Sequence, residues 1–232
     1  MKLAVMQPYL FPYIGYFQLM SSVDRFVIYD DVTFIKQGWI NRNRIRIGDQ
    51  AAYLTVPVRA ASSFDLICNV RISEARRWQT RLLRTISQAY ARAPHFPTVF
   101  DRVEALFRSG LETIADLARR SVLLVRDYLA IPSTIVETSA IYQNRDLSKQ
   151  QRVLDICRRE GCRTYVNAPG GRALYSRDLF ALHGIDLRFL KAGDIRYAQG
   201  DKPFLPDLSI LDVLMWNPPD RVQDFLTQCT LE

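Results

Sequence analysis

The chain has 232 residues, of which 48% are hydrophobic, so it can build a substantial core and is too apolar for a disordered protein. Its formal net charge of +7 suits an anionic ligand, and no stretch approaches the ~20 apolar residues of a membrane span. The apolar run at residues 3–6 is too short for a signal peptide, so we expect a cytoplasmic protein.

The first thirty residues predict strand, loop, helix and strand. Residues 2–6 are an apolar run, and residues 25–29 are a second run rich in β-forming residues. Pro8 and Pro12 exclude a regular helix between them until about residue 14, and a helix is expected over 14–22. In such a unit, the loop after the first strand and the end of the second lie at the carboxyl edge of the sheet, where ligands bind.

The middle of the chain predicts a hairpin followed by helices. Residues 43–47 and 52–58 flank a turn at Gly48-Asp49. Helical spacing follows over 78–90, with Ser73 as a candidate cap, Arg76 at its N3 position, and Pro94 and Pro97 at its end. Two more helices are expected over 100–107 and 111–129, and a strand over 134–137.

The last third returns to an α/β pattern. Ser148 begins a helix that runs to residue 160, and strands are expected over 163–166 and 186–190 with a helix over 174–183 between them. A helix over 209–215 precedes the breaker Asn217-Pro218-Pro219. We therefore predict one α/β domain over 1–232, with a mostly parallel sheet built from its N- and C-terminal parts and a helical insertion at about 73–130.

Three segments carry candidate site residues. The first follows the first strand and supplies Gln7, Tyr9, Tyr13, Tyr16 and Gln18. Its prolines and Gly15 fit a rigid loop that holds a sugar or base ring, although a rigid core turn has the same composition. Gln7 favours the functional interpretation, because an amide directly after a buried strand has little use in packing.

The second segment follows the second strand. Adjacent carboxylates at Asp30 and Asp31 require a nearby cation, which Lys36, Arg42, a substrate amine or a metal could supply. Asp31 is a candidate general base. Phosphate-binding or orienting roles are expected for Lys36, Asn41, Arg42, Asn43 and Arg44. The alternative is a solvated loop with surface ion pairs.

The third segment is a turn between a strand and a helix. It offers Asn167, Gly170, Gly171 and Tyr175, and backbone N–H groups at such a turn can bind an anion. The turn matches neither GxGxxG nor a Walker loop, so a simple left-handed turn is the alternative. Asp212, in an apolar helix, is either a helix-end partner or directed into the site.

The remaining polar residues suggest structural roles. The four cysteines are scattered and are expected to be reduced thiols, and His95 and His183 lie beside helix-ending residues. The sequence contains no HExxH, CxxC or GxSxG motif, so we predict neither a metal site nor a cofactor.

At these segments the chain closely resembles the WbqC-like protein family. The matching stretches are QPYLFPYIGYF, SSVDRFVIYDDVTFIKQGWINRNRI, YVNAPGGRALY, HGIDLRFL and FLPDLSILDVLMWN, in the family's order. The resemblance implies a role in bacterial surface-polysaccharide (O-antigen) biosynthesis, adding an acyl or aminoacyl group such as glycyl to a nucleotide-linked amino sugar. Some members have His where this chain has Tyr9, so a mechanism using that His as a base does not carry over.

The leading hypothesis is therefore a transferase that acts on a nucleotide-linked amino sugar. Asp31, Lys36 and Gln7 form the expected catalytic set, the arginines and the glycine turn hold the diphosphate, and the tyrosines contact base or sugar. An acyl- or aminoacyl-carrier protein is the expected donor partner. The alternatives are ATP-dependent nucleotidyl transfer, which requires a divalent metal, and a non-catalytic anion- or nucleic-acid-binding module. The latter fits poorly with Asp30, Asp31 and the tyrosine loop.

Overall fold

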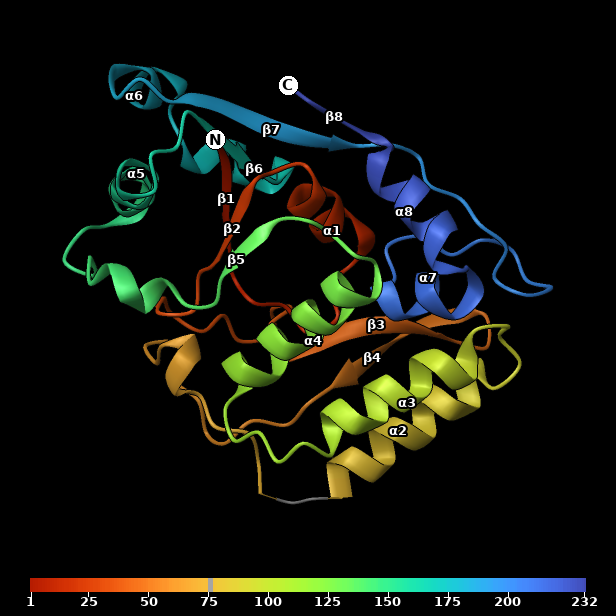
Figure 1. Ribbon diagram of the computed structural model, residues 1–232. Helices are drawn as coiled ribbons and strands as arrows, with labels where there is room; N and C mark the ends of the chain where they lie inside the picture. The colour runs from red at the N-terminus through yellow and green to blue at the C-terminus, as the bar shows by residue number, and fades with distance from the viewer. Residues whose placement is uncertain (75–76) are drawn as a thin grey trace.

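The computed structural model describes residues 1–74 and 77–232, and its main feature is a six-stranded sheet in the order β5-β2-β1-β6-β7-β8. The first five of these strands are parallel, and β8 pairs antiparallel with β7. Their bounds are β1 (Lys2–Met6), β2 (Arg25–Ile28), β5 (Thr134–Val136), β6 (Thr164–Asn167), β7 (Asp186–Ala192) and β8 (Cys229–Leu231). The predicted α/β fold, with its sheet built from both ends of the chain, is confirmed (Figure 1).

The strand order reverses beside β1. The chain proceeds from β1 to β2 and β5 on one side, and then crosses to β6 and β7 on the other. In parallel sheets such a reversal opens a crevice outside the carboxyl ends of the two strands at which the order changes. The residues that follow β1 and β6 therefore border the predicted ligand crevice.

Helices cover both faces of the sheet. Leu3, Val5 and Val27 belong to a core with α5 (Lys149–Arg159) and α6 (Arg177–Leu182). Ala4 and Phe26, on the opposite face, belong to a larger core. The helices of that larger core are α1 (Ile14–Ser21), α2 (Arg77–Tyr90), α3 (Phe96–Phe107), α4 (Ile114–Tyr128), α7 (Ile210–Trp216) and α8 (Pro219–Thr227). Three 3-10 helices span Ile67–Asn69, Ser139–Tyr142 and Pro169–Leu174.

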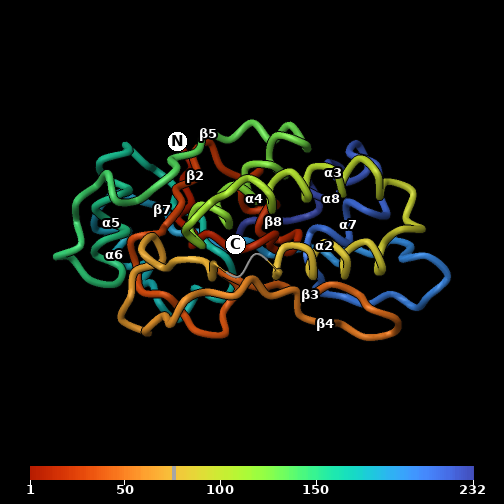
Figure 2. The backbone as a smooth tube through the Cα atoms, turned by 90° about the horizontal axis from the view of Figure 1, so that it is seen from below, coloured from red at the N-terminus to blue at the C-terminus, as the bar shows by residue number. Residues whose placement is uncertain are grey.

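A separate hairpin lies against the loop that follows β1. It consists of β3 (Arg42–Ile47) and β4 (Gln50–Thr55), joined through Gly48 at a positive φ of 63°. The N–H of Leu10 donates to the Trp39 carbonyl at 3.0 Å, just before β3. Figure 2, seen from below, shows the hairpin along one border of the molecule, and Figure 1 shows it on the side toward which β1 runs from the N-terminus.

Proline accounts for the main errors in the predicted elements. Pro97 does not end the region's first helix but lies in the first turn of α3, and Pro219 begins α8, which we did not predict. A proline fits there because the first N–H groups of a helix have no partner within the helix. The predicted helix over 174–183 is shortened to α6, with Ser176 capping it through the Leu179 N–H. The Arg76 position of the predicted cap lies outside the described residues.

Candidate functional site

The two carboxylates after β2 hold different layers of the protein together. Asp30 accepts hydrogen bonds from the Thr138 hydroxyl at 2.8 Å and the Ser139 N–H at 3.1 Å, in the segment after β5. Asp31 accepts from the Ser139 hydroxyl and forms an ion pair with Arg152 of α5. The Ser139 hydroxyl also lies 3.4 Å from Asp30, so the two carboxylates share this partner and only Asp31 reaches α5.

The cation beside Asp31 is Arg152, neither of the two cations expected from the sequence. Its Nη1 also donates to the Asp31 carbonyl at 3.1 Å, and its Nε donates to Asn144 at 2.8 Å. Its guanidinium lies 4.9 Å from the centre of the Tyr29 ring. The sequence held one signal for this residue, because Arg152 lies four positions before Ile156 on the buried stripe of α5.

Burial sets the protonation of this cluster. Burial raises the pKa of Asp30, and the Thr138 hydrogen bond opposes that rise. Burial also raises the pKa of Tyr29 to about 12, against the opposing charge of Arg152. The Tyr29 hydroxyl therefore keeps its proton at neutral pH and can donate a hydrogen bond.

The turn after β6 brings Asn167 and Tyr175 to the same side. Asn167 donates to the Tyr165 hydroxyl at 2.8 Å and accepts from the Ala168 N–H at 2.6 Å. A Cβ at Gly171 would lie 3.0 Å from the Asn167 side chain, whereas a Cβ at Gly170 would meet nothing within 4 Å. The Tyr175 hydroxyl is close enough to Tyr29 to raise its pKa.

Gln7 completes this group at the strand-order reversal. It is the first residue after β1, which lies between β2 and β6 in the sheet, so it lies beside the ends of both neighbouring strands. Its side chain is half-buried and forms no hydrogen bond with any residue that the structure describes. Gln7, Tyr29 and Tyr175 therefore offer polar groups that protein neighbours satisfy only in part, at the predicted crevice.

The three tyrosines of the first loop have different environments. Tyr16 is buried, donates to the Gln7 carbonyl at 3.1 Å and packs against Phe26, so it belongs to the core. Tyr9 is half-buried, 5.8 Å from Tyr16 between ring centres. Tyr13 is exposed and its ring covers Gly15, where a Cβ would lie 2.7 Å from its hydroxyl oxygen. Tyr9 and Tyr13 thus remain available to a ligand.

The loop is fixed at Phe11, which has a positive φ of 41°. Its N–H donates to the Ser121 hydroxyl at 2.9 Å. Its carbonyl accepts from Asn43 at 2.8 Å and from the Ser209 hydroxyl at 2.7 Å. Asn43 is therefore a buried support of the loop, since its side chain also bonds the Leu10 carbonyl at 3.0 Å.

Three other predicted residues have structural partners. Buried Gln18 donates to the Phe225 and Gln228 carbonyls at 2.9 and 3.1 Å, which ties α1 to the end of α8. Asn41 bonds the Val56 carbonyl at 2.9 Å. Asp212 accepts hydrogen bonds at 2.8 Å each from Tyr90, Tyr197 and Gln199, and burial raises its pKa. These contacts indicate that all three residues have structural roles.

Two of the three cations of the second segment, Arg42 and Arg44, lie on β3, opposite the buried face of Asn43 and Ile45, and Lys36 lies in the loop before it. Arg42 donates to the Gly38 carbonyl at 3.3 Å, and Arg44 donates to the Asp207 carbonyl at 2.9 Å. Lys36 is exposed and has no ion-pair partner in the described parts of the chain. No hydrogen bond or ion pair between described residues joins Arg42 or Gly170 to Asp31. The predicted convergence of the three segments is therefore present only in part.

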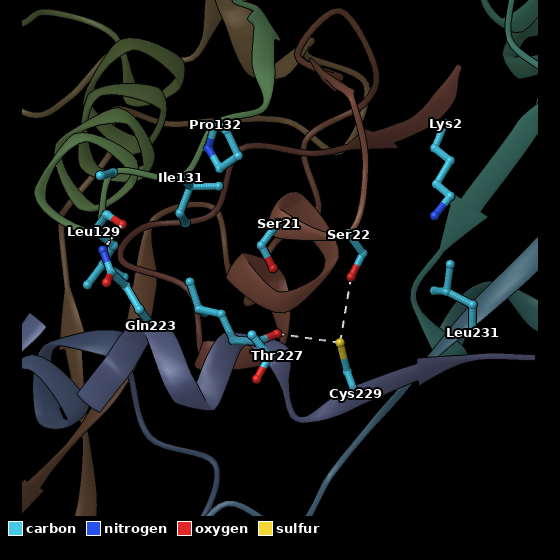
Figure 3. A pocket seen from close by; sticks show the side chains of 12 residues that line it. Lys2, Ser21, Ser22, Leu129, Ile131, Pro132, Gln223, Thr227, Cys229 and Leu231 are labelled. Atoms are coloured by element: carbon cyan, nitrogen blue, oxygen red, sulfur yellow. Dashed lines mark hydrogen bonds between the residues drawn. The ribbon is translucent and has the colours of Figure 1, made fainter. Parts of the chain in front are cut away.

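Two hollows lie near opposite edges of the sheet. One of about 640 Å³ borders Asp31 at the carboxyl edge, with Cys68, Gln143 and Arg145 in its wall. The other, of about 420 Å³, lies between α1, α8 and the residues before β5 (Figure 3). Gln223 in its wall donates to the Leu129 carbonyl at 2.8 Å, and the Ser22 hydroxyl lies 3.6 Å from the Cys229 sulfur. The first hollow adjoins the predicted site, and the second contains no predicted site residue.

These features define an α/β protein with polar and aromatic groups at the strand-order reversal of a parallel sheet. The chain belongs to the WbqC-like protein family, whose model matches residues 7–224. It is 30% identical over 230 residues to "Uncharacterized protein Rv1507c" of Mycobacterium tuberculosis, and the match covers 98% of each chain. No solved structure matches the chain. Within the described residues, no helix is long and apolar enough to cross a membrane.

Proposed function

We propose that the protein is a transferase that binds a nucleotide-linked amino sugar and transfers an acyl or aminoacyl group to the sugar amine. The observation that carries the proposal is the set of partly unsatisfied polar groups at the strand-order reversal, namely Gln7, Tyr29 and Tyr175. The strand-order reversal is where open parallel α/β sheets bind their ligands. The family resemblance supplies the polysaccharide context of the reaction.

The proposed reaction joins the amine nitrogen to the carbonyl carbon of a carrier-bound thioester. The C–N bond forms, the C–S bond breaks, and the amine proton passes through solvent to the departing thiolate. In this proposal the Tyr29 hydroxyl, protonated at neutral pH, donates a hydrogen bond to the oxyanion that develops on the carbonyl. Gln7 orients the acceptor, and an acyl- or aminoacyl-carrier protein delivers the donor.

The ion pair changes the role that we assign to Asp31. Both carboxylate oxygens of Asp31 already have a protein partner, the Ser139 hydroxyl on one and Arg152 on the other. We propose that Asp31 is a positioning residue, which holds Arg152 beside Tyr29. Loss of Asp31 is then expected to affect folding as well as turnover.

The strand order also supports ATP-dependent nucleotidyl transfer, because the five parallel strands have the arrangement of nucleotide-binding sheets. The two reactions differ in their metal requirement and in their products. Thermal-shift measurements with nucleotide sugars, ATP and single-stranded nucleic acid, with and without magnesium, separate binding by each class. Stabilisation by ATP only with magnesium, followed by pyrophosphate release, would replace the transferase proposal.

The decisive experiment is a transfer assay with a nucleotide-linked amino sugar and an acyl-carrier thioester, with product mass as the readout. Tyr29→Phe is expected to lower kcat by roughly 10²–10³-fold with little change in KM, because one oxyanion donor is removed. Leu182→Ala, on the exposed side of α6, is the matched control and should change neither constant. Normal turnover by Tyr29→Phe would remove this hydroxyl from the mechanism.

A further inference from the structure

Two neighbouring aromatic rings are exposed to solvent, Trp39 in the loop before β3 and Tyr53 in β4. Trp39 is 39% exposed and Tyr53 is 54% exposed. Their ring centres lie 6.3 Å apart and the rings are tilted by 36°. Large apolar side chains gathered at the surface commonly mark an interaction site. We call this surface, with Arg42 and Arg44, the aromatic platform.

Two guanidinium groups flank the rings. Arg42 lies 4.2 Å from the centre of the Tyr53 ring, and Arg44 lies 5.8 Å from the centre of the Trp39 ring. Arg44 and Tyr53 are direct cross-strand partners in the hairpin. Bonds to backbone carbonyls hold both guanidinium groups in place and use only some of their five N–H donors. The platform therefore combines flat apolar surface with positive charge.

The aromatic platform contacts the loop that follows β1. The Trp39 carbonyl accepts the Leu10 N–H, so Trp39 is fixed to that loop. Asp207, whose carbonyl binds Arg44, is also close enough to Tyr13 to raise the pKa of its hydroxyl. The platform and Tyr13 thus both border Asp207.

We propose that the aromatic platform binds a nucleoside diphosphate, with the base stacked on Trp39 and Tyr53 and the phosphates beside Arg42 and Arg44. The charge favours this occupant, since a base offers a π face and carries an anionic group, whereas a neutral sugar would not need two guanidinium groups. The inference rests on the proposed function, which supplies the amino sugar that is linked to the diphosphate. It transfers the base-binding role from buried Tyr16 to two residues outside the predicted set.

The test is calorimetric binding of UDP, uridine and inorganic diphosphate to the full-length protein. Replacing Trp39 with Ala should weaken UDP binding by about 5- to 150-fold, the effect of one stacked base, and leave diphosphate binding unchanged. Trp39→Phe should restore most of the affinity, because it keeps a flat ring. Arg44→Gln should weaken both UDP and diphosphate. Phe64→Ala, at an 86% exposed ring outside the platform, is the matched control.

Several outcomes would overturn the proposal. Unchanged UDP affinity in Trp39→Ala would do so, as would the failure of UDP and the other nucleoside diphosphates to bind. Tighter binding of oligouridine than of UDP would assign the surface to nucleic acid. A dimer that dissociates in Trp39→Ala would assign it to a second copy of the chain.

The platform and the transferase proposal can fail separately. UDP binding that depends on Trp39, without acyl transfer to any amino sugar, would retain the platform and remove the transferase. Acyl transfer with the same KM in the wild type and Trp39→Ala would retain the transferase and remove the platform.

Discussion

Asn in place of Asp31 removes the negative charge from a pair that is almost completely buried. The side chains of Asp31 and Arg152 are 2% and 6% exposed, so the remaining guanidinium would be left without a counter-charge in a poorly solvated position. Breaking a buried pair in this way costs about 3–5 kcal/mol, a large part of the roughly 5–15 kcal/mol that stabilises a typical domain. For a chain of this size the melting temperature should fall by about 6–20 °C.

Urea unfolding followed by circular dichroism measures this loss. Asp186→Asn removes an exposed carboxylate that pairs with Arg188, and it should cost no more than about 1 kcal/mol. The double variant Asp31→Asn/Arg152→Met should lose less stability than the sum of the two single variants, because neither charge remains unpaired. If Asp31→Asn unfolds within about 0.5 kcal/mol of the wild type, the ion pair does not hold α5 to the sheet and our reasoning is wrong.

Three further predictions concern other parts of the molecule. Burial raises the pKa of Asp212 in the folded protein above the value of 3.8 expected for the unfolded chain. The stabilisation that comes from this difference in pKa is therefore complete below pH 3.8 and is lost as the pH rises through the folded pKa. The stability of the wild type relative to Asp212→Asn should therefore increase as the pH is lowered from 7 to 4 in urea titrations, and a constant difference would contradict this. Gly193→Ala should lower the melting temperature more than Gly15→Ala, because the new Cβ meets a backbone carbonyl at 2.7 Å at the first site and only the movable ring of Tyr13 at the second. Gln18→Ala should cost about 1–3 kcal/mol through unsatisfied carbonyls at the end of α8, with unchanged ligand affinity by calorimetry; weakened affinity would return Gln18 to the site.

The sequence predicts the sheet well because its signals are local. Apolar runs such as Lys2–Met6, bounded by loops containing proline, specify strands without reference to distant residues. Proline was a misleading signal at Pro97 and Pro219, because a proline can follow the end of one helix or lie in the first turn of the next. A proline thus marks a helix boundary but does not show whether a helix ends or begins there.

The site was harder to predict because it depends on pairing across the sequence. Asp31 and Arg152 are 121 positions apart, and nothing near either residue identifies the other as its partner. Tyr13 and Tyr16 appear equivalent in the sequence, yet the start of α1 turns one to solvent and the other into the core. Because α1 begins at Ile14, Tyr13 lies before the helix and Tyr16 lies within it, so the two side chains have different environments.

The anchoring of Phe11 has a consequence for recognition. Its backbone is held by Ser121, Asn43 and Ser209, which come from three widely separated parts of the chain. A ligand arriving at Tyr9 or Tyr13 thus meets a surface whose shape is set before contact, and little conformational entropy is lost on association. Selectivity among chemically related ligands should then arise from fit to a rigid template, with association rates that vary little from one ligand to the next.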